Sequence, residues 1–120
     1  MNVLIVESRP ELSSVWKNHL ERQQMNVICA ATQDAAITHI ADHPVDIIIM
    51  DLILKEGSAL AISDYANFRQ PNARVIFVTN TSFFSDGSIF SHCSNASALV
   101  PAATTPEDLA AMVEHYGSSR

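Results

Sequence analysis

The sequence predicts an α/β fold, a doubly wound sheet of five parallel strands with helices on both faces. Five short apolar segments alternate along the chain with segments that have the apolar periodicity of helices. The third apolar segment, 45–52, is rich in isoleucine and lacks polar alternation, which is typical of a strand buried on both faces. Strict alternation of strands and helices favours parallel strands joined by right-handed crossovers. The predicted strands are residues 1–6, 25–30, 45–52, 74–78 and 98–100.

Each predicted helix has a recognisable start. Residues 8–11 (SRPE) match a capping box, in which Ser8 caps the helix and Glu11 reaches back to it. Thr32 and Ser58 are predicted caps of the next two helices, and residues 105–108 (TPED) predict the start of the last. The apolar faces are predicted to contain Leu12, Val15, Trp16 and Leu20; Ala36, Ile37, Ile40 and Ala41; Ala61, Ile62 and Tyr65; and Leu109, Met112, Val113 and Tyr116.

The chain reads as one domain covering residues 1–120. Its length is close to that of a typical single domain, and it contains no internal repeat, low-complexity segment or linker. Residues 81–95 are the least regular part, and we expect a loop there with a short or poorly formed helix. This segment contains two adjacent aromatic residues, Phe83 and Phe84, which we expect to pack under the loop rather than form a partner surface.

The composition excludes several classes of protein. A hydrophobic content of 48% allows a buried core, and a net charge of −6 argues against a dedicated nucleic-acid surface. There is no secretory signal and no apolar run long enough to span a membrane. The two cysteines lack metal-type spacing, so Cys29 is interpreted as a small core residue and the chain as cytoplasmic. His39 and His43 have helical spacing that could serve zinc, but we expect a surface pair.

Asp51 is the main candidate for chemistry. It lies at the carboxyl end of the predicted central strand, where open α/β sheets form their binding crevice. An aspartate at a strand end can also simply initiate a turn or cap a helix. The identity of the residues that end the neighbouring strands therefore decides between these interpretations.

Four segments resemble the receiver domain of response regulators, the phosphoacceptor module of two-component signalling. They are residues 3–7 (VLIVE), 46–52 (DIIIMDL), 75–79 (VIFVT) and 105–109 (TPEDL). None is decisive alone, but all four at these intervals are a specific signal, and the resemblance covers essentially the whole chain. The resemblance implies a flavodoxin-like sheet with strand order 2-1-3-4-5.

The resemblance also implies the residues of the site and the partners. Asp51 would accept a phosphoryl group from a sensor histidine kinase or a phosphotransfer protein, so the chain would be a substrate and not an enzyme. Glu7, Asp51 and the carbonyl of Ile53 would bind Mg²⁺, and Thr79 would contact the phosphoryl group. An output domain, another protein partner or a homodimer would fit the same family, whereas nucleic acid and membrane are not expected as direct partners.

The sequence departs from the family pattern at the supporting positions. Receivers usually have a second acid where this chain has Ser8, and a Lys-Pro pair where it has Pro101 and Ala102. The aromatic switch position on the last strand is Ala98. We therefore expect Mg²⁺ to bind weakly and Asp51 to be phosphorylated inefficiently.

The loop after Asp51 departs as well, because Lys55 and Ala59 stand where the family usually has proline and glycine. Arg9 or Lys55 could replace the missing cation, but each is interpreted as a solvated loop charge.

Two other functions were considered. A degenerate receiver would bind partners without phosphorylation, which Ser8, Pro101 and Ala98 favour. An enzyme on the same fold fits less well. A dehalogenase-type phosphatase would need an acid at Ile53, and a flavodoxin would need a glycine- and hydroxyl-rich loop at 7–10.

Overall fold

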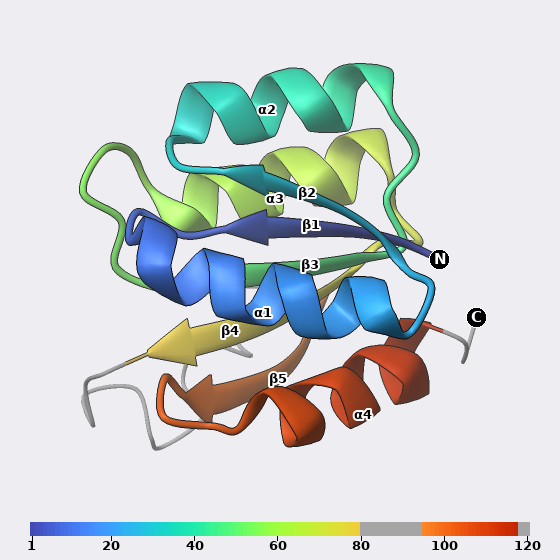
Figure 1. The fold of residues 1–120 in the computed structure, drawn as a ribbon. Helices are drawn as coiled ribbons and strands as arrows, with labels where there is room; N and C mark the ends of the chain where they lie inside the picture. Colours follow the sequence, from blue (N-terminus) through green and yellow to red (C-terminus); the bar gives the residue numbers. More distant parts are fainter. Residues whose placement is uncertain (80–94, 118–120) are drawn as a thin grey trace.

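A computed structural model describes residues 1–79 and 95–117 of the chain. The sheet has five parallel strands in the order β2-β1-β3-β4-β5, which confirms the predicted fold class and strand order (Figure 1). The expectation for residues 81–95 falls outside the described part of the chain, apart from Asn95. The strands are β1 (Asn2–Val6), β2 (Asn26–Ala30), β3 (Ile47–Asp51), β4 (Arg74–Thr79) and β5 (Ala96–Pro101). The helices are α1 (Pro10–Arg22), α2 (Gln33–Asp42), α3 (Ala59–Arg69) and α4 (Pro106–Gly117).

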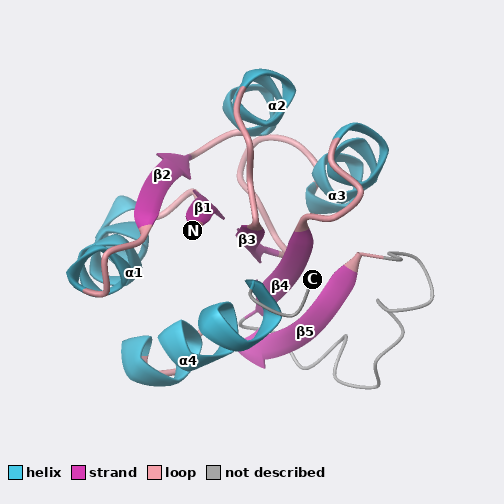
Figure 2. Cartoon of the chain, turned by 90° about the vertical axis from the view of Figure 1, so that its right-hand side faces the viewer, coloured by secondary structure: helices cyan, strands magenta, loops and turns pink. Residues whose placement is uncertain are grey.

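The sheet separates two apolar cores. Figure 2 shows α2 and α3 on one face of the sheet, with α1 and α4 on the other. Successive residues of a strand point to opposite faces, so β1, β3 and β4 contribute alternate side chains to each core. The core under α2 and α3 includes Leu4, Val6, Ile48, Met50, Val75 and Phe77, and the core under α1 and α4 includes Val3, Ile5, Ile47, Ile49, Ile76 and Val78. All five residues of β3 are buried, as its uninterrupted apolar run predicts.

The predicted helix caps are correct except at α1. Thr32 and Ser58 each accept a hydrogen bond from a backbone N–H of the first turn, and Thr105 does the same for α4. The N-cap of α1 is Arg9, whose side chain makes no capping bond, so the predicted Ser8 cap is wrong. Pro10 begins α1, where its missing N–H costs nothing. The Ser8 hydroxyl is instead engaged by a distant loop, as described below.

Two predicted core residues are exposed. Cys29 lies on β2, which is an edge strand, and of this strand only Val27 and Ala30 are buried. Val15 is 50% exposed because it lies beside the buried stripe of α1 formed by Ser13, Trp16 and Leu20. The pattern of apolar residues does not tell which strand lies at an edge, and the interpretation of Cys29 as a core residue is therefore wrong.

Polar side chains fix the ends of the helices to the sheet. Gln70, which follows α3, donates to the carbonyls of Ile40 and His43 at 2.8 and 2.7 Å and accepts from the N–H of Val45 at 2.8 Å. A single amide thus joins the end of α2, the end of α3 and the segment leading into β3. Arg69 adds two hydrogen bonds to the carbonyl of Ala41, at 3.3 and 3.0 Å.

The loop between β3 and α3 is also fixed. Gly57 has φ of +103°, and a Cβ added there would lie 2.3 Å from Cβ of Gln33. The Gln33 side chain accepts a hydrogen bond from the N–H of Ser58 at 2.8 Å. Glycine is therefore required at position 57 both by the positive φ and by the close approach of α2.

The two ends of the described chain lie at the edge of the sheet where the strands begin (Figure 1). Met1 precedes β1, and Gly117 is the last residue of α4. The two residues lie close together, because a Cβ added to Gly117 would lie 2.6 Å from the Met1 sulfur. The strands end at the opposite edge. Among the described helices, none is long and apolar enough to cross a membrane.

Candidate functional site

Three polar residues meet where β1, β3 and β4 end. Glu7 follows β1, Asp51 ends β3 and Thr79 ends β4. The strand register pairs Val6 with Met50 and Asp51 with Val78, which sets the three residues along one edge of the sheet. All three are buried, with exposures of 2%, 8% and 8%. The structure therefore brings together the residues that the sequence analysis placed in the site.

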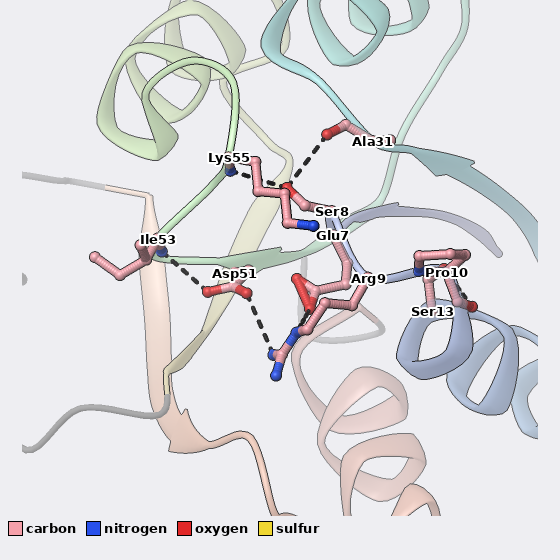
Figure 3. A network of polar contacts seen from close by, with 9 residues as sticks. All are labelled: Glu7, Ser8, Arg9, Pro10, Ser13, Ala31, Asp51, Ile53 and Lys55. Atoms are coloured by element: carbon pink, nitrogen blue, oxygen red, sulfur yellow. Dashed lines mark hydrogen bonds and ion pairs between the residues drawn. The ribbon is translucent and has the colours of Figure 1, made fainter.

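The carboxylate of Asp51 is held by one backbone group and faces one cation (Figure 3). Its Oδ1 accepts a hydrogen bond from the N–H of Ile53 at 2.9 Å, and its Oδ2 lies 3.4 Å from Nη2 of Arg9. The side chain is 11% exposed, so it is largely buried but keeps some access to solvent. The hydrogen bond from Ile53 fixes the orientation of this carboxylate.

The interpretation of Arg9 as a solvated loop charge is wrong. The Nε of Arg9 donates to Oε1 of Glu7 at 2.6 Å while its Nη2 faces Asp51, so the guanidinium joins the two acids (Figure 3). It is not a solvated loop charge, although its side chain remains 34% exposed. Lys55 is exposed, as expected, and its backbone N–H is the group that contacts Ser8.

Glu7 is an acid in an apolar setting. Its side chain is fully buried, and among the described residues its Oε2 has no hydrogen-bond partner. The pKa of Glu7 is raised from its ordinary 4.5 to about 7, mainly by burial and also by the nearby Asp51, while the Arg9 guanidinium opposes the shift. The same contact with Glu7 raises the pKa of Arg9. A buried, unpartnered carboxylate oxygen is suited to a proton or a cation.

The arrangement fits Mg²⁺ only in part. The free Oε2 of Glu7 is a hard oxygen of the kind that Mg²⁺ prefers. However, the guanidinium of Arg9 already engages the other Glu7 oxygen and faces Asp51, and Ser8 adds no charge. In the described part of the chain, no group of three or more His, Cys, Asp or Glu side chains could hold a metal ion. Of the predicted ligands, Glu7 and Asp51 therefore both contact the guanidinium of Arg9, which lies where a metal shared by the two acids would be expected.

Ser8 joins three loops of the site. Its hydroxyl accepts a hydrogen bond from the N–H of Lys55 at 3.0 Å and donates to the carbonyl of Ala31 at 3.5 Å (Figure 3). The loops after β1, β2 and β3 therefore meet at one side chain. The sequence could not show this role, because the contact to Lys55 spans 47 residues.

The end of β5 brings no cation to the site. Pro101 is its last residue, pairs with Thr79 in the sheet and is exposed. The N–H of Ala102 donates to the carbonyl of Thr79 at 2.9 Å, which fixes this loop beside β4. Ala98 is buried against the core under α1 and α4 and has no ring that could change position.

Of the predicted histidine pair, His39 lies in α2 and His43 is the C-cap residue of this helix. The rings of His39 and His43 stack with centroids 4.6 Å apart. Burial and the neighbouring His43 lower the pKa of His39. No third His, Cys, Asp or Glu side chain joins the pair in a possible metal-binding group within the described residues.

Comparisons with known proteins give a consistent result. A CheY-like response regulator receiver domain from Methanospirillum hungatei JF-1 is 22% identical over 97% of this chain and 92% of that chain, with a TM-score of 0.87. The non-phosphorylated HemR receiver domain from Leptospira biflexa is 18% identical over 99% and 95%, with a TM-score of 0.86.

A third similar structure is a response regulator from Burkholderia pseudomallei with a phosphorylated aspartic acid, a calcium ion and citrate. It is 20% identical over 98% of this chain and 72% of that chain, with a TM-score of 0.81. No curated protein matches the sequence. The family model for the response regulator receiver domain matches residues 3–113, and the chain therefore belongs to the response regulator receiver domain family.

Proposed function

We propose that the chain is a phosphoaccepting receiver of a two-component phosphorelay. Asp51 takes a phosphoryl group from a sensor histidine kinase or a phosphotransfer protein, and the chain acts as their substrate and not as an enzyme. The observation that supports this most is the position of Asp51 at the end of β3, with Oδ1 fixed by the N–H of Ile53 and the side chain partly accessible to solvent.

The proposed transfer follows ordinary phosphoryl chemistry. An Asp51 oxygen attacks phosphorus, the bond from phosphorus to the donor breaks, and the leaving group keeps the electron pair. The Arg9 guanidinium partly neutralises the charge that gathers there, and Thr79 is proposed to contact the phosphoryl oxygens. Loss of one charge-assisted contact costs about 1.5–3 kcal/mol, or roughly one to two decades in rate. With Pro101 in the lysine position, phosphorylation is therefore proposed to be inefficient.

The test is labelling by acetyl phosphate in the presence of Mg²⁺, followed by intact-protein mass spectrometry. The wild type should gain one phosphoryl group slowly, Pro101→Lys should gain it faster, and Asp51→Asn should gain none. Label that persists in Asp51→Asn would show that the acceptor is misassigned. Rapid, stoichiometric labelling of the wild type, unchanged by Pro101→Lys, would show that the missing lysine is irrelevant.

A degenerate receiver that binds partners without phosphorylation is the second candidate. The pairing of both acids with Arg9 favours it, because the site already contains its own cation. Folded wild type and folded Pro101→Lys that both stay unlabelled, even with a histidine kinase as donor, would establish this alternative.

The proposal also covers Mg²⁺ binding, the protein partners and the cellular location. Mg²⁺ is proposed to bind weakly at Glu7, Asp51 and the carbonyl of Ile53. The proposed partners are the kinase or phosphotransfer protein, together with an output domain, another protein or a second copy of the chain. The proposed location is the cytoplasm, and the net charge of −6 does not suit direct contact with nucleic acid.

A further inference from the structure

We propose that the guanidinium of Arg9 is the resident cation of the Glu7–Asp51 pair, and that a divalent metal binds there only by displacing it. The inference concerns metal binding in the absence of any phosphodonor. It therefore does not depend on whether Asp51 is phosphorylated.

The contacts of Arg9 are those of a counter-ion shared by two acids. Nε reaches Oε1 of Glu7 at 2.6 Å, and Nη2 reaches Oδ2 of Asp51 at 3.4 Å. Both acids are buried, so repulsion between the two carboxylates is weakly screened, and a positive charge nearby stabilises their ionised forms. The planar guanidinium can serve two carboxylates at once because its donors are fixed in a fork.

A metal bound by both acids would compete with Arg9 for the carboxylate oxygens that the guanidinium contacts, Oε1 of Glu7 and Oδ2 of Asp51. The buried Oε2 of Glu7 has no hydrogen-bond partner among the described residues, but alone it would give a hard divalent cation a single protein ligand, with water in the rest of the octahedral shell. A metal that uses both acids must place its charge beside the guanidinium, at a distance where like charges repel strongly. Metal and guanidinium therefore compete for the same two side chains.

Arg9 can leave without unfolding its surroundings. It is the N-cap of α1 and its side chain makes no capping bond, so the helix does not depend on it. The side chain is 34% exposed and has a path to solvent. A positive charge at the start of a helix is disfavoured by the helix dipole, so the two acids are what keep the guanidinium there.

The first test measures Mg²⁺ affinity by calorimetry in wild type, Arg9→Gln and Arg22→Gln. Arg22→Gln is the matched control, because it removes the same charge from the other, exposed end of α1. Arg9→Gln should bind Mg²⁺ about tenfold more tightly or better, as expected for loss of a charge-assisted competitor. Arg22→Gln should change the affinity by much less. Equal or weaker binding by folded Arg9→Gln would overturn the proposal.

The second test uses the wild type and so does not depend on a variant folding. The Nε–H resonance of Arg9 should show a hydrogen-bonded proton in metal-free protein, since Nε donates to Glu7. On titration with Mg²⁺, this resonance should lose its protection from solvent exchange in step with the shift of the Ile53 amide, which donates to Asp51. An Arg9 signal that stays protected while the Ile53 amide shifts to saturation would show that metal and guanidinium coexist, and would overturn the proposal.

Discussion

Glu7 carries a stability cost that depends on pH. Its folded-state pKa is raised from 4.5 to about 7, so the folded protein binds its proton more tightly than the unfolded chain does. A raised carboxyl pKa leaves the fold unaffected below pH 4.5 and weakens it progressively as pH rises through 7. We predict that Glu7→Gln, which cannot ionise, gains unfolding free energy relative to wild type across this window, of the order of 2 kcal/mol.

The measurement is urea unfolding of both proteins at several pH values between 4 and 8, with chelator present to remove metal. Titrations shared by the two proteins cancel in the difference, including those of the exposed acids. A difference that stays constant with pH would show that Glu7 titrates normally in the fold.

A single substitution at Ser8 should add a third carboxylate to the site, beside those of Glu7 and Asp51. Asp at this position can still accept the Lys55 N–H that the serine hydroxyl accepts. We predict that Ser8→Asp binds Mg²⁺ about tenfold more tightly, because a third hard, negatively charged oxygen joins Glu7 and Asp51. Calorimetry checks this, with Ser14→Asp on the exposed face of α1 as the control for added charge. Similar gains in the two variants would mean that only the overall charge matters.

At the scale of the elements, Gln70 connects several secondary-structure elements through its side chain. Its amide joins the ends of α2 and α3 to the residues that enter β3. We predict that Gln70→Ala lowers the unfolding free energy by about 2 kcal/mol or more, since the N–H of buried Val45 loses its acceptor. Urea unfolding measures this, and Asn67→Ala on the exposed face of α3 should be close to neutral. Equal effects of the two substitutions would contradict the role assigned to Gln70.

The sequence predicts elements well where the signal is local. The caps at Thr32 and Ser58 and the buried strand β3 are correct because cap chemistry and apolar runs act within a few residues. The cap at Ser8 is wrong because the same hydroxyl is used by the N–H of Lys55, far along the chain. The prediction that Cys29 is a core residue is wrong because burial of a strand residue depends on whether its strand lies at the edge of the sheet.

At the scale of the whole molecule, the two cores share one sheet. Trp16 is the single tryptophan and is 2% exposed in the core under α1 and α4. Because β1, β3 and β4 contribute to both cores, neither can melt while the other stays packed. We predict that tryptophan fluorescence and far-UV circular dichroism give the same urea midpoint. A fluorescence transition at lower urea would show that the core under α1 and α4 unfolds separately.

The sequence predicts where the candidate site lies, but it does not predict that Arg9 pairs with the two acids of the site. Glu7 follows β1, Asp51 ends β3 and Thr79 ends β4, and parallel pairing of these neighbouring strands brings their ends to one edge of the sheet. The pairing of Arg9 with Asp51 joins residues 42 positions apart and depends on the direction of a flexible side chain. No local pattern carries that information, which is why Arg9 was interpreted as a solvated charge.

The proximity of Met1 and Gly117 has a practical consequence. Both lie at the edge where the strands begin, and Asp51 lies at the edge where they end (Figure 1). A surface tether attached at either terminus would therefore leave the acid pair facing the solution. Immobilised protein would present the edge of the sheet that holds Asp51 to a kinase in solution, so binding of the kinase could be followed on a sensor chip.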